Sequence, residues 1–267
     1  MKTLGFIGTG NMGSALARAA AKVVSSDNLL LSDAYAASAE QLSAELGCKA
    51  VAINTVAVSA DMIWLGVKPQ VMAGLLSTIA PFLAARTEPF VLVSMAAGLS
   101  THDIRRMAGG DYPVIRIMPN IPVKSGSGLI LYDATENVTA DDLENFRWSM
   151  TYAGLLDRIP EHLIDAGSAL SGCGPAFVSM FIEALADGAV ACGLPRASAL
   201  TYAEQTLLGT AKYLLDTGEH PAALKDAVCS PGGSTIAGVL ALEKGGLRSA
   251  AAEAVKDAFR RTKELGK

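Results

Sequence analysis

Short apolar runs alternate with longer helical patterns over the first 120 residues of the chain. Continuous apolar runs are typical of strands that are buried on both faces, and apolar positions three or four apart are typical of helices. Strands are predicted at residues 4–7, 29–32, 60–67, 90–94 and 114–118, and helices at 14–21 and 38–46. Strands that alternate with helices in this way form a parallel sheet with right-handed crossovers.

The pattern changes twice further along the chain. Pro119 and Pro122 interrupt it, because prolines so close together continue neither a strand nor a helix. Strands are expected at 128–132 and 155–159, on either side of a helix at 140–150. Beyond Glu161 the spacing is helical, over residues 176–192, 197–216, 224–228, 235–243 and 247–265. The prediction is an α/β domain at residues 1–160 followed by an all-α domain at 161–267.

Several of the later helices are apolar on nearly every side. One small helical domain cannot bury that much apolar surface alone, so we expect a homo-oligomer, a dimer or an assembly of dimers, built mainly from this domain. The overall composition, with 51% apolar and 18% charged residues, supports burial between subunits.

Charge and cysteine content narrow the possible partners. A formal charge of -4 without a basic run disfavours nucleic acid or an anionic membrane as partner. We expect no membrane span, because no uninterrupted apolar stretch is long enough, and no secretory leader ahead of the first strand. Cys48, Cys173, Cys192 and Cys229 lack metal or redox spacing and fit a reducing compartment. The prediction is a cytoplasmic protein without a metal centre.

A glycine-rich turn joins the first strand to the first helix. It reads Gly8-Thr9-Gly10-Asn11-Met12-Gly13, the GxGxxG pattern of dinucleotide-binding loops, in the strand-turn-helix context that this pattern requires. Gly8 permits the turn, Gly10 leaves room for a pyrophosphate, and Gly13 allows the helix to pack closely on the strand. The helix N-terminus offers free N–H groups to the phosphates. We therefore expect this turn to bind a nicotinamide dinucleotide.

The second strand ends in Ser32 and Asp33. The spacing from the glycine turn suits a carboxylate that binds the adenine ribose 2'-hydroxyl, which favours NADH over NADPH. An exposed acid at the start of a loop is the alternative.

Two further strand ends belong to the same edge of the sheet, because ligands of such sheets bind beyond the carboxyl ends of the strands. Ala96 and Ala97 are small enough for a nicotinamide ring to lie against the backbone, although close helix packing explains them equally well. The other strand ends at Val67, Lys68 and Pro69.

A second glycine-rich break, residues 230–235, lies between two helices of the later region and reads Ser230-Pro231-Gly232-Gly233-Ser234-Thr235. Successive glycines ahead of a helix expose several N–H groups in one direction, which suits a carboxylate or a phosphate. An ordinary helix cap would explain each serine and threonine singly.

The residue types present favour an imine over a carbonyl as the electrophile. Carbonyl reduction needs a positioned acid to protonate the developing alkoxide, and His102, His162 and His220 all lie where surface or capping histidines are expected. An iminium is already cationic, so hydride addition neutralises charge and needs no oxyanion hole. A cofactor, an anion site and hydroxyl groups are chemically sufficient for that reaction.

Six stretches, spread over nearly the whole chain, resemble the pyrroline-5-carboxylate reductase family. They are residues 6–13 (FIGTGNMG), 67–70 (VKPQ), 96–98 (AAG), 116–120 (RIMPN), 170–176 (LSGCGPA) and 230–238 (SPGGSTIAG). The first is shared with many dehydrogenases, whereas the last is highly specific. The resemblance implies hydride transfer from NADPH, with NADH possible, to the C=N bond of 1-pyrroline-5-carboxylate. By the same resemblance, the product would be L-proline and the reaction the last step of proline biosynthesis.

The resemblance also implies a fold and a set of roles. The fold is α/β, an N-terminal Rossmann-type parallel-sheet domain followed by an all-α dimerisation domain, with each active site near the subunit interface. The cofactor-binding residues are expected to be Gly8, Thr9, Gly10, Asn11, Met12, Ser32, Asp33, Asn54, Val67, Lys68, Pro69, Ala96, Ala97 and Glu161. The substrate-binding residues are expected to be Ser230, Gly232, Gly233, Ser234 and Thr235. Thr235 is the expected catalytic residue, since its hydroxyl would orient the imine nitrogen.

The sequence departs from the family pattern at two positions. Asp33-Ala34-Tyr35 stands where many NADPH-using members carry an arginine or several hydroxyls, and an acid there repels a 2'-phosphate unless it turns away. Cys173 stands where serine is common.

Two other functions compete with the reductase. A hydroxyacid dehydrogenase with an N-terminal GxGxMG domain would need a catalytic lysine on an interior helix, and Lys212 and Lys225 lack the sequence context of that group. A non-catalytic NAD(P)-sensing protein would have no need for the intact loop at residues 230–235.

Overall fold

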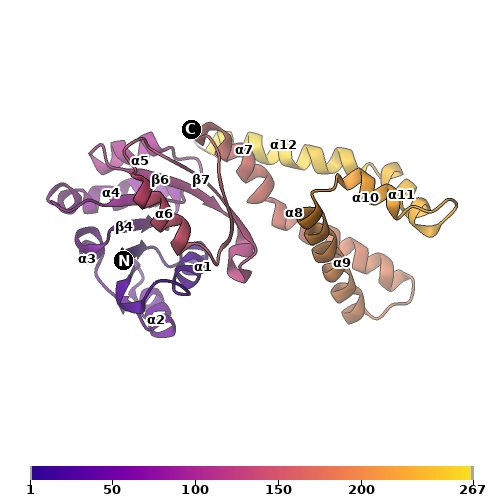
Figure 1. Cartoon of the computed structure of the whole chain (residues 1–267), viewed down its shortest axis with the longest axis horizontal. Coiled ribbons are helices and arrows are strands. Elements are labelled where there is room, and N and C mark those ends of the chain that lie inside the picture. The colour runs from indigo at the N-terminus through magenta and orange to yellow at the C-terminus, as the bar shows by residue number, and fades with distance from the viewer. Residues whose placement is uncertain (1, 266–267) are drawn as a thin grey trace. The chain divides into compact units, whose positions relative to one another are not determined.

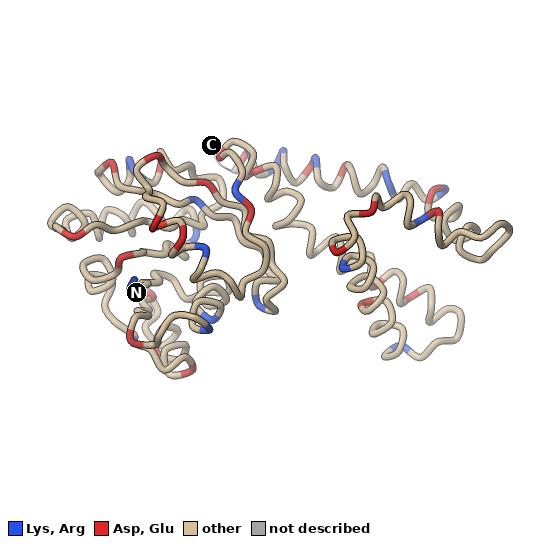
Figure 2. The backbone as a smooth tube through the Cα atoms, viewed as in Figure 1, with Lys and Arg blue, Asp and Glu red and all other residues tan. Residues whose placement is uncertain are grey.

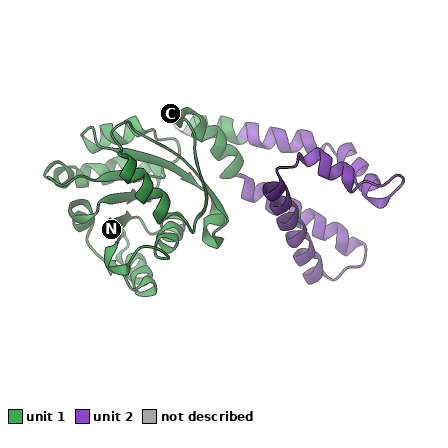
Figure 3. Ribbon diagram, viewed as in Figure 1, with its two compact units in different colours: residues 1–172, 258–267 green, residues 173–257 purple. Residues whose placement is uncertain are grey.

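The computed structural model describes residues 2–265, which divide into two compact units (Figure 3). Unit 1 comprises residues 2–172 together with 258–265, and unit 2 comprises residues 173–257. The last helix therefore begins in unit 2 and ends in unit 1.

A single sheet forms the centre of unit 1 (Figure 1). Its strands are β1 (Leu4–Ile7), β2 (Leu29–Ser32), β3 (Lys49–Ala50), β4 (Met62–Leu65), β5 (Val91–Ser94), β6 (Val114–Pro119), β7 (Gly128–Ala134) and β8 (Gly154–Arg158). The order across the sheet is β3-β2-β1-β4-β5-β6-β7-β8. The first six strands run parallel, whereas β7 is antiparallel to β6 and parallel to β8. The parallel order reverses at β1 and β4, where ligands of such sheets bind.

Helices cover both faces of this sheet. One face packs against α1 (Asn11–Ala20), α2 (Ala36–Leu46) and α6 (Ala140–Ser149), and the other against α3 (Ile53–Ser59), α4 (Pro69–Ala84) and α5 (Thr101–Ala108). The 3-10 helices η1 (Ser26–Asn28) and η2 (Ile121–Ser125) lie in connections, and α7 (Glu161–Ser171) follows β8. The apolar runs of the sequence are thus buried on both sides, as predicted for a parallel sheet.

The alternation of side chains along β1 shows how the two faces are filled. Phe6 packs into the α1 side of the sheet and Ile7 into the α4 side. Phe6 stacks on Trp64 of the neighbouring β4, with ring centroids 5.1 Å apart, and Trp64 contacts Phe146 of α6. These rings anchor the centre of the sheet, because large aromatic side chains bury the most apolar area.

Three details differ from the prediction. The sequence pattern did not indicate β3 or α3, because both are short. Pro119 continues β6 by one residue, opposite Ile130 of β7, so the strand ends after the first of the two prolines and not before it. The expected domain boundary at residue 160 falls inside unit 1, because α7 packs its fully buried Ile164 against Leu131 of β7 and Met118 of β6.

Unit 2 consists of helices and leaves much apolar surface open. Its helices are α8 (Gly174–Ala191), α9 (Arg196–Thr217), α10 (Pro221–Ala227), α11 (Ser234–Lys244) and the first part of α12 (Leu247–Leu265). The α8–α9 pair packs through small residues, of which Ala186 and Ala199 are buried. Large apolar side chains are exposed, including Val178, Met180, Tyr202, Leu208, Leu215 and Leu240. Acidic and basic residues are interspersed along both units (Figure 2).

One stretch, residues 161–191, is long and apolar enough to cross a membrane when judged by length and hydropathy alone. The sequence expectation concerned uninterrupted apolar stretches, and this stretch contains Glu161, Asp165, Glu183 and Asp187. The first part of this stretch is α7, whose Asp165 forms ion pairs with Arg116 and Lys263 of unit 1. Lipid could not replace these contacts, so we assign α7 to the core of unit 1.

Candidate active site

A groove of about 1180 Å³ opens in unit 1 beyond the carboxyl ends of β1, β2, β4 and β5. It is lined by expected cofactor residues from each of these strand ends, which the fold brings together: Gly8, Gly10, Asn11, Met12, Ser32, Asp33, Val67, Lys68, Pro69 and Ala97. Such a volume exceeds that of most single-metabolite pockets and suits an extended ligand. The groove therefore lies where a doubly wound sheet holds a dinucleotide.

The glycine turn has the conformation that each glycine was expected to provide. Gly8 has φ 97°, a left-handed value, and its N–H donates to the carbonyl oxygen of Ser32 at 2.8 Å. A side chain at Gly13 would collide with the Gly8 carbonyl oxygen. Gly10 is the N-cap of α1, and no atom lies within 4 Å of the position that a Cβ would take there. The N-terminus of α1 is thus free to receive phosphates through its backbone N–H groups.

Asp33 is held against this turn. Its Oδ2 accepts hydrogen bonds from the N–H and the hydroxyl of Thr9, at 2.6 and 3.0 Å, and its Oδ1 accepts one from the N–H of Tyr35 at 2.9 Å. Thr9 itself is buried. The carboxylate therefore couples the end of β2 to the glycine turn while still lining the groove.

These bonds determine how Asp33 titrates. Burial raises the pKa of the Asp33 carboxyl, but the donors from Thr9 and Tyr35 outweigh burial, so the pKa lies below its usual value. A carboxyl with a lowered folded-state pKa stabilises the fold above its unfolded-state pKa. This stabilisation is lost as the pH falls through the folded-state pKa. Asp33 is therefore charged at neutral pH, and it is one of two acids in the groove lining, together with Glu40.

Replacing Asp33 by serine is expected to raise the ratio of NADPH to NADH efficiency by about tenfold, since one negative charge leaves the adenosine end. Affinity for both cofactors should fall as well, because Thr9 loses its acceptor. Steady-state kinetics with each cofactor measure the ratio, and Asp27→Ser, in η1, serves as the control. An unchanged ratio would mean that this carboxylate does not face the ribose.

Four expected cofactor residues are not part of the groove lining. Thr9 donates its N–H and hydroxyl hydrogen bonds to Asp33. Ala96 is buried among the apolar residues on the side of the sheet that packs against α4. Asn54 is exposed on α3, next to the lining residue Ile53. Glu161 lies at the start of α7, where its carboxylate accepts hydrogen bonds from Thr101 of α5.

Other lining residues had no assigned role in the sequence analysis. They include Ala34, Ala36, Ala39 and Glu40 after β2, residues 50–53 at and after the end of β3, and Met95, Met118 and Ile121. The signal for residues 50–53 was too weak to find, because β3 has only two residues. Met118 and Pro119 belong to the RIMPN segment and Ile121 follows it, but their residue types alone predict no contact with a cofactor.

The loop at residues 230–235 lies wholly in unit 2. Gly232 has φ 68°, and the N–H of Gly233 donates to the carbonyl oxygen of Ser230 at 3.0 Å, which closes a turn. Gly233 is the N-cap of α11, so the N–H groups of Ser234 and Thr235 belong to the first helical turn, which has no intrahelical acceptors. Ser230, Ser234 and Thr235 are exposed. The loop thus combines free N–H groups and hydroxyls, as the anion-site interpretation requires.

The histidines have the places expected of surface and capping residues. His220 is the N-cap of α10, and its ring nitrogen accepts a hydrogen bond from the N–H of Ala222 at 3.2 Å. His102 lies on α5 and His162 at the exposed start of α7. Neither lines the groove.

Comparison with known proteins identifies the family of this chain. A family model described as pyrroline-5-carboxylate reductase dimerisation matches residues 161–265, and one described as NADP oxidoreductase coenzyme F420-dependent matches residues 3–98. The chain is 42% identical to the pyrroline-5-carboxylate reductase of Methanosarcina acetivorans, over 99% of this chain and 98% of that protein. It is 38% identical to the pyrroline-5-carboxylate reductase of Escherichia coli, over 100% and 99%.

Solved structures agree with this result. The pyrroline carboxylate reductase of Plasmodium falciparum with NADP bound has a TM-score of 0.87 at 30% identity, covering 100% of this chain and 98% of that one. The pyrroline-5-carboxylate reductase of Coxiella burnetii has a TM-score of 0.91 at 29% identity, covering 100% and 99%. The chain therefore belongs to the pyrroline-5-carboxylate reductase family, and it is an NAD(P)H-dependent oxidoreductase that reduces the cyclic imine 1-pyrroline-5-carboxylate.

Proposed function

We propose that unit 1 binds NADPH in its groove and that the loop at residues 230–235 of unit 2 binds the carboxylate of 1-pyrroline-5-carboxylate. The observation that carries the first assignment is the junction of the glycine turn with a groove that crosses the carboxyl ends of four strands. The relative solved with NADP bound and the NADP oxidoreductase match at residues 3–98 support the phosphorylated cofactor. NADH is a second substrate in this proposal, because Asp33 and Glu40 line the groove and disfavour a 2'-phosphate.

The chemistry needs few groups from the protein. When bound, the reduced nicotinamide would supply a hydride to the carbon of the C=N bond, which is not the carbon that carries the carboxylate. The positive charge of the protonated C=N bond is neutralised in that step, so the ring nitrogen keeps its proton and the product is L-proline. The protein binds the substrate carboxylate with the N–H groups at the start of α11, and the Thr235 hydroxyl orients the ring nitrogen. Ser230 and Ser234 supply further hydroxyls at this loop.

The first experiment is the steady-state reduction of 1-pyrroline-5-carboxylate with NADPH and with NADH, followed by loss of reduced-cofactor absorbance. Turnover with a higher kcat/KM for NADPH supports the proposal in full. A preference for NADH would overturn the choice of cofactor and leave the groove assignment in place. Binding of the cofactor without turnover would favour the sensing protein, and turnover of a hydroxyacid instead would favour the dehydrogenase.

Replacing Thr235 by alanine is expected to lower kcat/KM by about tenfold while cofactor affinity stays constant. The reason is that a hydrogen bond to a charged partner contributes about 1.5–3 kcal/mol. Thr235→Ser keeps the hydroxyl and should retain most of the activity, which makes it the matched control. An unchanged kcat/KM in the alanine variant would show that Thr235 has no role in the mechanism.

Dimerisation through unit 2 is part of the proposal. The exposed apolar residues of α8, α9 and α11 and the dimerisation match at residues 161–265 support it. Light scattering measures the mass and separates a dimer from an assembly of dimers.

The cysteine content and charge support a cytoplasmic location.

A further inference from the structure

Asn120 is the residue at which β6 ends and η2 begins, and it does not itself line the groove. Its neighbours Met118, Pro119 and Ile121 do line it, and these three residues form the β6 wall of the groove. In the sheet, β2 and β3 lie on one side of β1 and β4, and β5 and β6 on the other. With the phosphates at the glycine turn and the adenosine beyond β2, the nicotinamide reaches the side of β5 and β6. The β6 wall therefore belongs to the nicotinamide end of the groove.

The side-chain oxygen of Asn120 replaces a main-chain acceptor of the sheet. The β6–β7 register pairs Pro119 with Ile130, so the next step places Asn120 opposite Leu129. The main-chain carbonyl of Asn120 instead accepts a hydrogen bond from the N–H of Val123 in η2, at 3.2 Å. Oδ1 of the side chain accepts the N–H of Leu129 at 2.9 Å. The chain thus leaves the strand at Asn120 without leaving a main-chain N–H of β7 unpaired.

The side-chain nitrogen of Asn120 supplies a missing donor at the end of α7. In a continuing helix, the carbonyl oxygen of Ser171 would accept the N–H four residues further on, but that residue is Pro175, which has no N–H. Nδ2 of Asn120 donates to this carbonyl oxygen at 3.0 Å. Asparagine carries an acceptor and a donor side by side, whereas an ionised aspartate of the same size carries acceptors alone. One amide therefore joins the ends of β6 and α7 and the start of β7.

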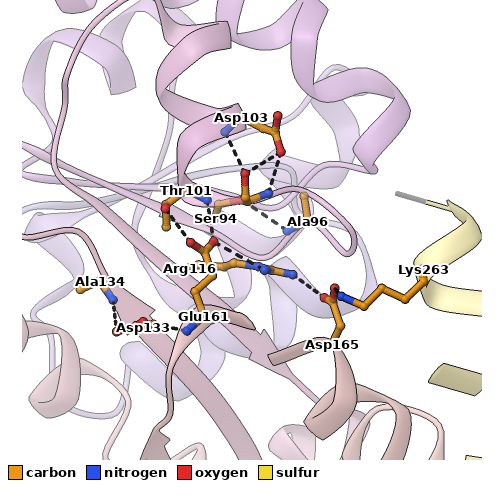
Figure 4. A network of polar contacts seen from close by, with 11 residues as sticks. Ser94, Ala96, Thr101, Asp103, Arg116, Asp133, Ala134, Glu161, Asp165 and Lys263 are labelled. Atoms are coloured by element: carbon orange, nitrogen blue, oxygen red, sulfur yellow. Dashed lines mark hydrogen bonds and ion pairs between the residues drawn. The ribbon is translucent and has the colours of Figure 1, made fainter. Parts of the chain in front are cut away.

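The helix that receives this bond is itself held firmly against β6 (Figure 4). Arg116 of β6, with its side chain only 5% exposed, donates from Nη2 to Oδ1 of Asp165 at 2.6 Å. Its Nη1 lies 3.5 Å from Oε1 of Glu161, and Lys263 of α12 reaches Oδ2 of Asp165 at 3.2 Å. Because α7 cannot shift along β6 without breaking these contacts, a bond to its last residue ties the β6 wall to a fixed element.

We propose that Asn120 is a positioning residue of the reductase, whose amide holds the β6 wall in the place where it covers the bound nicotinamide. This inference rests on the proposed function, in that the groove binds a nicotinamide dinucleotide. Strand pairing holds the wall only as far as Pro119, and Ile121 beyond it is 49% exposed. Loss of the amide would leave the N–H of Leu129 and the carbonyl of Ser171 without their partners, so the wall would shift as these groups reach water or new partners.

The test compares a ligand that carries a nicotinamide with one that does not. Asn120→Ala is expected to lower the affinity for NADPH by about tenfold and to leave the affinity for 2'-phospho-ADP-ribose unchanged, because only NADPH reaches the β6 wall. Asn145→Ala is the matched control, since its Nδ2 donates to the carbonyl of Asp141 within α6 and the residue does not line the groove. A purely structural role would weaken both ligands equally. That result, or unchanged affinity for NADPH, would overturn the inference.

Asn120→Asp is a milder change that separates the two bonds. It keeps the acceptor for Leu129 but cannot donate to Ser171, so the ratio of the affinities for NADPH and 2'-phospho-ADP-ribose should still fall by about threefold. A ratio equal to that of the native protein would show that the tie to α7 does not position the wall, and would also overturn the inference.

A double variant tests whether Asn120 acts through the wall. Ile121→Ala shortens a wall side chain directly, so adding Asn120→Ala to it should weaken NADPH binding less than Asn120→Ala does in the native protein. Fully additive losses would contradict the inference. All affinities are measured without imine, so they are decided separately from turnover. If the native protein binds neither ligand, the proposed function fails, and with it the premise of this inference.

Discussion

Replacing Gly13 with alanine is expected to weaken NADPH binding by at least about a hundredfold, since two or more charge-assisted bonds to the pyrophosphate would be lost, each worth about 1.5–3 kcal/mol. The added Cβ would collide with the carbonyl oxygen of Gly8, which is backbone and cannot swing away. The glycine turn or α1 must then shift. Such overpacking should also lower the free energy of unfolding by about 1–3 kcal/mol.

Gly10→Ala is the control that separates the fold from the site. No atom lies within 4 Å of a Cβ built at Gly10, and its φ of -63° suits alanine. Stability should therefore stay constant while cofactor binding weakens, because the methyl group would point into the pyrophosphate site. Titration with NADPH and urea unfolding measure the two effects. If either variant keeps the full affinity for NADPH, the pyrophosphate does not bind at this turn.

Replacing Arg116 by leucine is expected to lower the free energy of unfolding of unit 1 by about 3 kcal/mol, because removal of one partner leaves buried charge uncompensated. Asp165 and Glu161 are 15% and 28% exposed, so neither can fully recover its hydration. Urea unfolding followed by tryptophan fluorescence measures this unit alone, since Trp64 and Trp148 both belong to it.

Arg158→Leu is the matched control for this change. Arg158 is about half exposed and pairs with Asp133 at 3.3 Å, so its loss should cost less than about 1 kcal/mol. In an Asp165→Asn background, the effect of Arg116→Leu should shrink, because one of the uncompensated charges is gone. If Arg116→Leu and Arg158→Leu lower the free energy of unfolding equally, the loss of Arg116 leaves no uncompensated buried charge.

The parallel part of the sheet was predictable because five of its strands, β1, β2, β4, β5 and β6, are buried. The runs that became β1, β2, β4 and β5 are short and almost entirely apolar, and the β6 run is apolar apart from Arg116, which is the pattern expected of strands covered on both faces. β3 was missed because its two residues, Lys49 and Ala50, are exposed and carry no such signal. The antiparallel direction of β7 could not be predicted from the composition of the strand. It depends on the short connection through η2 that joins β7 to β6.

The candidate site was predictable where backbone geometry decides it. Gly8 and Gly13 can be assigned from sequence because few other residues permit that turn, and Gly10 because a side chain there would take the space of the pyrophosphate. Spacing placed Asp33 at the right strand end, but it could not fix the direction of the carboxylate, which is turned toward Thr9. The partners of Arg116 lie 45 and 49 residues away in the chain, so only the fold reveals them. A charged residue inside an apolar strand was the available clue.

The return of α12 to unit 1 affects how the protein is made. A ribosome delivers residues 2–172 first, and domains generally fold in the order in which they are synthesised. The sheet, with its last strand β8, therefore leaves the ribosome before the helices of unit 2 do. The Lys263–Asp165 pair can form only after the whole helical unit has emerged. The nascent sheet domain therefore has to persist without its final segment, and unit 2 folds as an insertion that is tethered at both ends.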